Sequence, residues 1–473
     1  MNNNDSGKLS LLEKLSYGFG DLASVLYWQT FMLYFTFFYT DVFLIPAAAA
    51  ATMFLVSRVW DGVNDPLMGI LADRTNTKYG KFRPYLLWLC VPFAVMGVLT
   101  FTVPDFDETG KLIWAYATFF GIMMLYTAIN IPYTALLGVI SPDSKERTTL
   151  SSIKFIFAYS AGTIVAFTLL PMSRALGNGD DASGWQMSFI IYGIAAVIFF
   201  LITFRFTKER VKPPKAQTAN VKKDLLELVT NKPWLILLAV TITFILFVAV
   251  RGSVTVHYFK YFVGPHELDI PFLNKGTYDF EWLSGFYNGV GQISSLIGVF
   301  IVNWFAKVVG KKNAFVIFFV IAVFSTGAIY WLDADQLGLL FALQISGSIT
   351  GGPLSVLIWA MYADTADYAE WKKGRRTTGL IFSASTMSQK IGWALGSYIA
   401  LNLMAQVGFA PNVAQSADSI DGLILLFSII PAIMGVLSII ILYFYPLNDN
   451  RVEEIEKELK QRRKESGDEP LAV

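Results

Sequence analysis

The chain has 473 residues, of which 54% are hydrophobic and only 15% are charged. Soluble domains carry about 25% charged residues, so this composition excludes an ordinary soluble enzyme and is typical of a polytopic membrane protein. The net charge of +1 gives no reason to expect a nucleic-acid partner. The single cysteine, Cys90, excludes an intrachain disulfide and a cysteine metal cluster.

Apolar runs of membrane-spanning length recur along the chain, and we count about twelve of them. Residues 1–14 lack the order of a signal peptide, so the first run is expected to remain in the membrane. Six runs precede a hydrophilic linker and six follow it. They cover residues 17–42, 47–71, 85–103, 112–140, 150–170, 187–206, 233–263, 280–305, 314–332, 339–362, 377–407 and 423–445.

This pattern predicts an all-α membrane protein with twelve transmembrane helices in two halves. The halves are residues 1–206 and 233–447, joined by a linker at 207–232 and followed by a tail at 448–473. The tail sequence RVEEIEKELKQRRKE is expected to form a short surface helix.

Loop charges predict the orientation of the chain. Basic residues gather in the loops around Arg74–Arg83, in the linker, at Lys307–Lys312 and at Lys372–Arg376, whereas the opposite loops are richer in Asp and Glu. Because basic loops stay in the cytoplasm, both termini and the linker are expected there, with the protein in the cytoplasmic (inner) membrane.

Two loop motifs recur weakly in the two halves. ERTT at 146–149 precedes an apolar run with Lys154, and RRTT at 375–378 precedes one with Lys390. The basic loop after the second run is echoed by WFAKVVGKKN after the eighth. Two related six-helix halves are typical of the major facilitator fold, which holds its substrate between the halves at mid-membrane.

The second run contains three charged residues, Arg58, Asp61 and Asp65, at spacings that place them on one helix face. Each charge at membrane depth costs roughly 2.5–3.5 kcal/mol to insert, so such residues indicate an ion or substrate path. Two carboxylates one turn apart suit Na⁺ or H⁺, with further oxygens from Asn64. The alternative is a structural ion-pair set built on Arg58.

Lys390 lies within the eleventh run and needs an acidic partner or water. Asp61 and Asp65 are the expected partners, and a lysine that changes partner when the cation binds would couple the ion to the conformational change. The alternative is a fixed ion pair.

Candidate substrate groups come from the fourth and fifth runs and from aromatic residues. Asn130 both donates and accepts hydrogen bonds, and Lys154 could bind sugar hydroxyls or balance the aspartates. The alternatives are a helix-packing amide and a snorkelling lysine. Aromatic rings that could stack on a sugar are Tyr27, Trp28, Tyr126 and Tyr133.

Charged residues at helix ends predict a gate. Asp364 and Asp367 end the tenth run, and Asp73 and Arg74 end the second, so salt bridges there would close the cytoplasmic side. The alternative is a solvated helix end. The chain has no P-loop motif and no nucleophile–base arrangement, so neither an enzyme nor a cofactor is expected.

Several motifs carry a family resemblance that runs from about Leu15 to about Tyr445. They are KLSYGFGD, FYTDV, RVWDGVNDPLMG, KYGKFRPYLL, NIPYTAL and ADTADYAEWK, followed by Lys390. The chain resembles the glycoside–pentoside–hexuronide:cation symporters of the major facilitator superfamily. The resemblance implies alternating access and symport of a sugar with Na⁺, H⁺ or Li⁺. It implies that Asp61, Asp65 and Thr127 lie at the cation site and Lys390 nearby.

The resemblance breaks at the sugar site. The acidic sugar ligand of the first helix in the melibiose carrier, the best-known relative, falls at Val25 here, and that of the fourth helix at Asn130. The tryptophan that follows the latter ligand falls at Thr134. The cation site is therefore expected to be kept and the sugar to differ from melibiose. A hexuronide is among the options, because a sugar site with fewer acidic residues repels its carboxylate less.

We therefore predict a monomeric sugar:cation symporter that works by alternating access. Within the same class, a lysolipid or other amphiphile transporter is the alternative. A membrane sugar sensor that binds without transporting is the alternative from another class.

Overall fold

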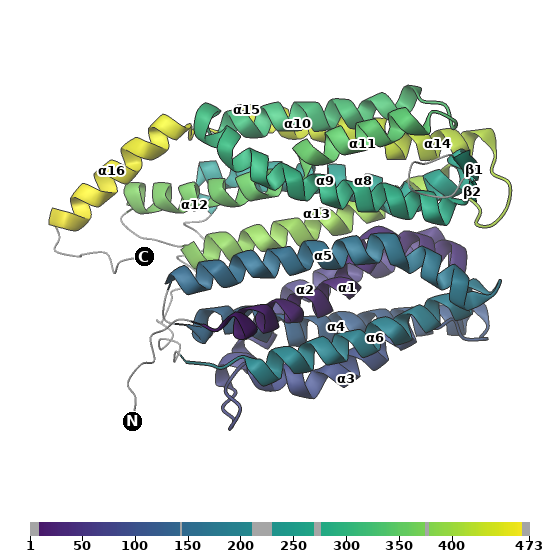
Figure 1. Ribbon diagram of the computed structural model, residues 1–473. Helices are drawn as coiled ribbons and strands as arrows, with labels where there is room; N and C mark the ends of the chain where they lie inside the picture. Colours follow the sequence, from purple (N-terminus) through teal and green to yellow (C-terminus); the bar gives the residue numbers. More distant parts are fainter. Residues whose placement is uncertain (1–8, 142–143, 211–228, 269–275, 374–377, 466–473) are drawn as a thin grey trace. The chain divides into compact units, whose positions relative to one another are not determined.

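The chain folds into two compact units of helices (Figure 1). In this computed structural model, residues 9–141, 144–210, 229–268, 276–373 and 378–465 are described. The first unit comprises Met1–Lys215, Pro265–Gly289 and Gly408–Gln415, and the second comprises the remainder. The expected all-α architecture is confirmed.

The first unit contains the helices expected for the first half. In chain order they are α1 (Leu11–Phe37), α2 (Ala47–Arg74), α3 (Arg83–Thr100), α4 (Glu108–Ile140), α5 (Ser144–Gly177) and α6 (Asp181–Phe206). A short π-helix, Phe38–Val42, extends α1. Three helices begin after a polar residue, Ser10, Asp107 or Asp180, whose side chain accepts a backbone N–H of the first turn.

Helix α1 has neighbours on two sides within the first unit. It packs against α5 and α6, and more narrowly against α4. Helix α3 packs on α4 and α6, and α2 packs on α4 (Figure 1). Close approach depends on small residues: the ring of Tyr133 covers Gly20 of α1, and the ring of Tyr27 covers Gly97 of α3. Helix α1 therefore presents a glycine to the tyrosine ring of α4 and a tyrosine ring to the glycine of α3.

The second unit contains most of the remaining helices. In chain order they are α8 (Lys232–Tyr258), α9 (Phe280–Val309), α10 (Lys311–Ala328), α11 (Leu337–Gly351), α12 (Leu354–Lys373), α13 (Thr378–Gln406), α14 (Ala417–Phe427), α15 (Ile429–Tyr443) and α16 (Asp449–Glu465). A π-helix, Phe259–Val263, extends α8, and a 3₁₀ turn, Ile329–Trp331, extends α10.

Two of the expected continuous runs are interrupted. Residues 339–362 divide between α11 and α12, because Pro353 lacks an N–H and restricts the backbone of Gly352 before it. Residues 423–445 divide between α14 and α15 at Ser428, whose backbone leaves the helical region. In both places the apolar stretch remains long enough to cross a membrane.

Nine helical stretches of the described residues are long and apolar enough to span a membrane. Helices α1, α2 and α13 are not among them, although each has more than 18 residues. These three helices carry Asp21, the Arg58–Asp65 set and Lys390, respectively. Each of these charges raises the free energy of transferring its helix into a bilayer.

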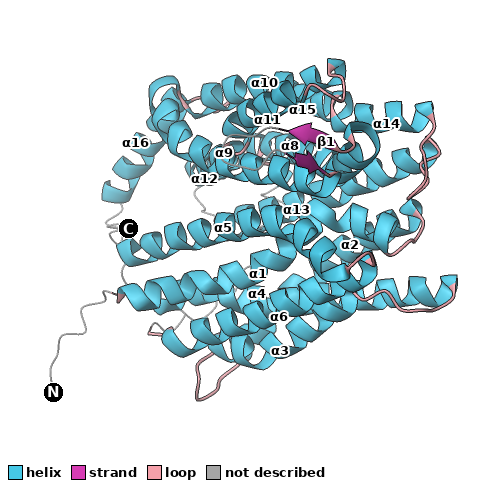
Figure 2. Ribbon diagram, turned by 45° about the vertical axis from the view of Figure 1, so that its right-hand side comes forward, coloured by secondary structure: helices cyan, strands magenta, loops and turns pink. Residues whose placement is uncertain are grey.

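The boundary between the units differs in detail from the expected split of the sequence. Pro265–Gly289 belongs to the first unit and contains a hairpin of β1 (His266–Leu268) and β2 (Gly276–Tyr278), which pair antiparallel (Figure 2). Arg174 of α5 forms ion pairs with Asp279 and Glu281 at the start of α9. These ion pairs join the segment to α5, a contact that the sequence composition did not predict.

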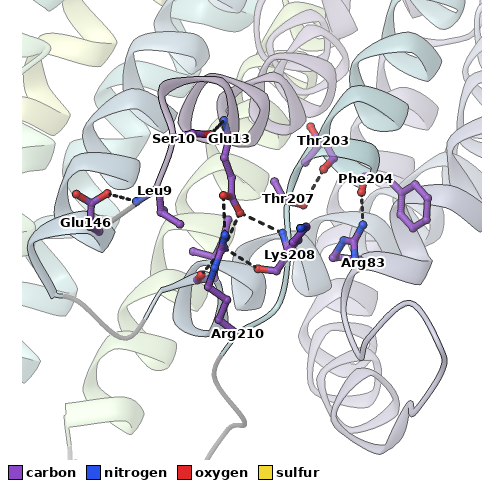
Figure 3. A network of polar contacts seen from close by, with 11 residues as sticks. Leu9, Ser10, Glu13, Arg83, Glu146, Thr203, Phe204, Thr207, Lys208 and Arg210 are labelled. Atoms are coloured by element: carbon purple, nitrogen blue, oxygen red, sulfur yellow. Dashed lines mark hydrogen bonds and ion pairs between the residues drawn. The ribbon is translucent and has the colours of Figure 1, made fainter. Parts of the chain in front are cut away.

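A polar network joins the first unit at the end predicted to face the cytoplasm (Figure 3). Glu13 pairs with Arg210 at 2.7 Å and also accepts the backbone N–H of Lys208. Glu146 pairs with Lys14 at 2.8 Å. Charge-assisted hydrogen bonds therefore hold the segment that follows α6 against α1, and hold α1 against α5.

The carboxylate of Glu209 caps helix α3. It accepts the backbone N–H groups of Lys81, Phe82 and Arg83 at 2.8, 2.8 and 3.0 Å. Gly80 precedes them with a φ of +107°, and the Glu209 carboxylate occupies the space that a Cβ would need there. Glycine is therefore required at this turn.

The second unit repeats this arrangement. Gly310 has a φ of +87°, and Asp449, at the start of α16, accepts the backbone N–H of Lys311 at 3.1 Å. In each half, a glycine with positive φ is followed by a lysine. The backbone N–H of that lysine donates to a carboxylate in the segment that follows the last helix of the half. The structure thus supports the weak repeat of basic loops.

The expected surface helix of the tail is confirmed as α16. It buries Val452, Ile455 and Leu459 in the second unit's core. The indole N–H of Trp371 on α12 donates to Glu458 at 2.6 Å.

We expect Glu209→Gln to lower the free energy of unfolding by about 1–2 kcal/mol, because the N-terminal amides of α3 lose an anionic acceptor. The thermal unfolding midpoint of the purified protein in detergent measures this effect. Glu267→Gln on the exposed strand β1 is the matched control. Equal midpoints for the two variants would show that the carboxylate charge of Glu209 contributes nothing.

Candidate functional site

A buried ion pair lies in the middle of α2. Nη1 of Arg58 is 3.0 Å from Oδ2 of Asp61, and the two side chains are 2% and 4% exposed. The guanidinium carbon of Arg58 lies 4.7 Å from the ring centres of both Trp28 and Phe54. Two aromatic faces and one carboxylate therefore hold this cation, and the predicted ion-pair alternative describes part of the site.

Asp65, one turn beyond Asp61, lies in a different environment. It is half-buried, and it accepts a hydrogen bond at 3.0 Å from the hydroxyl of Thr127 on α4. Asn64 is half-buried beside it, and its buried amide nitrogen has no hydrogen bond within the described chain. Asp65, Thr127 and Asn64 thus offer carboxylate, hydroxyl and amide oxygens, which are the ligands that small hard cations prefer.

A path of contacts leads from this ion pair to the predicted substrate residues. Trp28 stacks on Tyr126 with ring centres 5.4 Å apart. The amide of Asn130 donates to the Tyr126 hydroxyl at 3.2 Å. Trp28 also lies against Arg58, so three of the predicted substrate residues form one connected group with the Arg58–Asp61 pair.

A second charged pair lies in the first unit, and its acidic member was missed in the sequence. Lys154 of α5 lies 3.7 Å from Oδ1 of Asp21 on α1, with side chains 23% and 8% exposed. Asp21 precedes Trp28 by two helical turns, so the two share one face of α1. Trp28 in turn lies against Arg58, so both charged pairs border the same face of α1.

The four predicted aromatic residues do not all reach this region. Tyr133 lies below Lys154, whose ammonium is 5.6 Å from its ring centre, and its hydroxyl donates to the Tyr17 carbonyl. Tyr27 is fully buried against Phe93 and Phe189, toward α3 and α6. The helical step of about 100° from Trp28 turns Tyr27 away from the polar region, and its role in substrate binding stays a prediction.

Lys390 lies in the second unit, half-buried on α13. Its exchange of partners with the aspartates of α2 stays a prediction. The same unit contains another basic residue inside an apolar run, Arg251 on α8, which was not among the predicted site residues. Arg251 donates to Gln344 at 3.0 Å and lies 5.0 Å from the ring centre of Phe427. A single arginine inside an apolar run would have been a sufficient signal.

The predicted gate residues have different environments. Asp364 is buried and accepts two hydrogen bonds from the ammonium of Lys311, at 2.6 and 2.5 Å. The expected salt bridge there is confirmed, whereas its role as a gate stays a prediction. Asp367 is half-buried and Arg74 is exposed. The side chain of Asp73 lies outside the described residues.

Within the described part of the chain, no group of three or more His, Cys, Asp and Glu converges on one point.

Comparison with known proteins identifies the family of the chain. The family model described as MFS/sugar transport protein matches residues 16–449. The chain is 35% identical over 462 residues to the putative glycoside/cation symporter YagG of Escherichia coli, covering 98% of this chain and 97% of that one. It is also 35% identical to the isoprimeverose transporter of Lactiplantibacillus pentosus, covering 94% and 90%.

Solved structures show the same fold at low identity. A crystal structure of the nucleoside transporter NupG matches with a TM-score of 0.61 at 13% identity, covering 91% of this chain and 98% of that one. A structure of a proton-dependent oligopeptide transporter matches with a TM-score of 0.64 at 11% identity, covering 94% and 99%. The protein is a membrane transporter and not an enzyme. By its motifs, its fold and its relatives, the chain belongs to the MFS/sugar transport protein family and, within it, to the glycoside–pentoside–hexuronide:cation symporters.

Proposed function

We propose that the protein imports a glycoside or oligosaccharide together with Na⁺ or H⁺, and that the carboxylates of Asp61 and Asp65 take the cation. The two relatives at 35% identity are named for glycoside/cation symport and for isoprimeverose transport, which favours sugar over lipid cargo. The coupling cation is transported together with the sugar and is not a resident cofactor.

The proposal is supported by one connected group of side chains, which joins the Arg58–Asp61 ion pair to the predicted substrate residues. Arg58, bound to Asp61, lies against Trp28, and Trp28 stacks on Tyr126. A cation that attracts the carboxylate of Asp61 changes the charge balance of Arg58, which that carboxylate holds. Any such change reaches the aromatic surface on which a sugar ring would stack.

The residues have distinct proposed roles. Asp61, Asp65 and Thr127 contact the cation, Asn64 is a further oxygen donor, and Arg58 orients Asp61. Asn130 and Tyr126 bind substrate hydroxyls, and Trp28 provides the apolar face. Lys390 compensates the aspartates when the cation is absent, and Asp364 closes the cytoplasmic end. The protein acts as a monomer in the cytoplasmic membrane with both termini in the cytoplasm.

Counterflow in proteoliposomes tests the proposal. A panel of radiolabelled pentosides, glycosides and lysolipids is exchanged at fixed pH with and without Na⁺. We expect exchange of a glycoside or oligosaccharide that the cation accelerates. Exchange of lysolipid alone would assign the amphiphile function, and binding without exchange would assign a sensor.

A further inference from the structure

A polar cavity lies in the second unit, at the end that is predicted to face the cytoplasm. Its volume is about 610 Å³, within the range of about 300–1,000 Å³ that small-molecule sites occupy. The last turn of α9, the first residues of α10 and the start of α16 line it. Of the described residues that line the cavity, none is proposed above to bind the cation or the sugar.

The cavity contains charges of both signs. Lys307, on the last turn of α9, is exposed and forms no ion pair with another described residue. Lys311 also lines the cavity, but its ammonium donates two hydrogen bonds to Asp364. Asp449 is half-buried and uses Oδ1 to accept the backbone N–H of Lys311 at 3.1 Å. The ammonium of Lys307 and Oδ2 of Asp449 therefore remain available to a ligand.

An apolar stripe on α9 ends at this cavity. Phe300, Trp304 and Val308 recur every four residues, so they share one face of the helix, and they are 73%, 67% and 67% exposed. In a membrane transporter such a face lies against lipid tails. Val308 itself lines the cavity, and Tyr443, at the end of α15, is an exposed aromatic residue of the kind found at membrane–water interfaces. The cavity thus begins where the lipid-facing surface of α9 ends, at the depth of lipid headgroups.

We propose that this cavity binds the headgroup of a phospholipid that carries a primary ammonium, such as phosphatidylethanolamine. Lys307 binds the phosphate, Asp449 accepts a hydrogen bond from the ammonium, and an acyl chain follows the α9 stripe. The bound headgroup would bridge the end of α9 and the start of α16.

The charges of the cavity explain this choice of headgroup. An anionic headgroup without an ammonium would meet the Asp449 carboxylate with no donor for it, and a choline headgroup has no N–H to donate. The site is separate from the residues proposed for the cation and the sugar. Its failure would therefore leave the proposed transport function untouched.

Native mass spectrometry of the purified full chain tests this binding. Delipidated protein in detergent receives phosphatidylethanolamine, phosphatidylcholine or phosphatidylglycerol with identical acyl chains at equal concentration. We expect the phosphatidylethanolamine adduct to be at least about fivefold more abundant than either of the others. Equal adducts with the ethanolamine and choline lipids, or a stronger adduct with phosphatidylglycerol, would overturn the proposal.

Lys307→Gln removes the proposed phosphate partner at an exposed position, so the fold is kept. We expect the phosphatidylethanolamine adduct to fall at least about fivefold, whereas Lys307→Arg, which keeps the cation, retains it. Lys208→Gln is the matched control, because Lys208 is another exposed lysine at the predicted cytoplasmic end and does not line the cavity. Equal adducts in Lys307→Gln and Lys208→Gln would refute the role of Lys307 and with it the proposal.

Asp449→Asn separates recognition of the ammonium from the capping of α10, because the amide oxygen of Asn can still accept the backbone N–H of Lys311. We expect this variant to lose at least about fivefold of the preference for phosphatidylethanolamine over phosphatidylglycerol. An unchanged preference would show that the carboxylate does not read the headgroup.

Glycerophosphoethanolamine distinguishes a lipid from a soluble phosphodiester, since it has the same headgroup without acyl chains. We expect it to bind at least about tenfold more weakly than the lipid, because it cannot contact the α9 stripe. Binding as tight as that of the lipid would assign the cavity to a soluble ligand and overturn the proposal.

Discussion

Asp65→Asn and Asp61→Asn, made singly, are expected to give proteins that cannot concentrate sugar, with a lower unfolding midpoint for Asp61→Asn alone, because that variant leaves the buried Arg58 without its carboxylate. Asn keeps the size of Asp but removes the charge that holds a cation. Transport would then lack its driving ion, and the internal sugar concentration would not exceed the external one. Asp65→Asn is the sharper case, because Asp65 contacts a neutral hydroxyl at 3.0 Å whereas Asp61 also holds Arg58.

The measurement is accumulation of radiolabelled glycoside in proteoliposomes under an imposed Na⁺ or H⁺ gradient. Asp105→Asn is the matched control and accumulates normally. Thr127→Val is a graded variant, since it removes only the hydroxyl on Asp65, and we expect it to weaken the apparent cation affinity by about tenfold. If both Asp→Asn variants retain gradient-driven accumulation, the carboxylates of α2 do not couple the ion.

The second large effect concerns stability. Arg58→Met removes the cation from a pair that is 2% and 4% exposed, which leaves the Asp61 carboxylate uncompensated inside a spanning helix. Breaking one side of a buried ion pair costs about 3–5 kcal/mol. We therefore expect a markedly lower thermal unfolding midpoint in detergent. Because methionine can still pack between the rings of Trp28 and Phe54, this decrease reports the lost charge rather than lost packing.

The double variant Arg58→Met with Asp61→Asn separates lost charge from lost packing. Because it removes both charges, we expect most of the stability to return, while cation-driven accumulation stays absent. Arg205→Met, at the exposed end of α6, is the matched single control. A double variant as unstable as Arg58→Met alone would show that the aromatic contacts of the guanidinium hold this part of α2 together.

The sequence indicated the α2 site because its charges interrupt an otherwise apolar run. Arg58, Asp61 and Asp65 share a helix face at spacings that any helix imposes, and the cost of burying them is large. The helix break at Pro353 follows from the same local chemistry, although apolar content alone predicted a continuous run there. Features that depend on local rules were therefore within reach of the sequence.

Asp21 and Tyr27 show where local rules were insufficient. Asp21 lies near the start of the first run, where a charge is typical of a helix end, and its partner Lys154 comes from a helix that is distant in sequence. Trp28 and Tyr27 are neighbours in sequence, yet one contacts Arg58 and the other contacts Phe93. Which of these two faces of α1 meets the charged residues depends on the packing of α1 against its neighbouring helices.

The central claim is that a cation bound at Asp61 and Asp65 drives sugar uptake, and steady-state accumulation tests it most directly. Wild-type proteoliposomes receive fixed gradients of Na⁺, Li⁺ or H⁺, and the final ratio of internal to external glycoside is measured. One-to-one coupling predicts that a tenfold gradient of the coupling ion supports a sugar ratio of up to about ten, since each tenfold step is worth about 1.4 kcal/mol. A ratio of about one under all three gradients, with normal counterflow, would mean a facilitator without ion coupling and would contradict the claim.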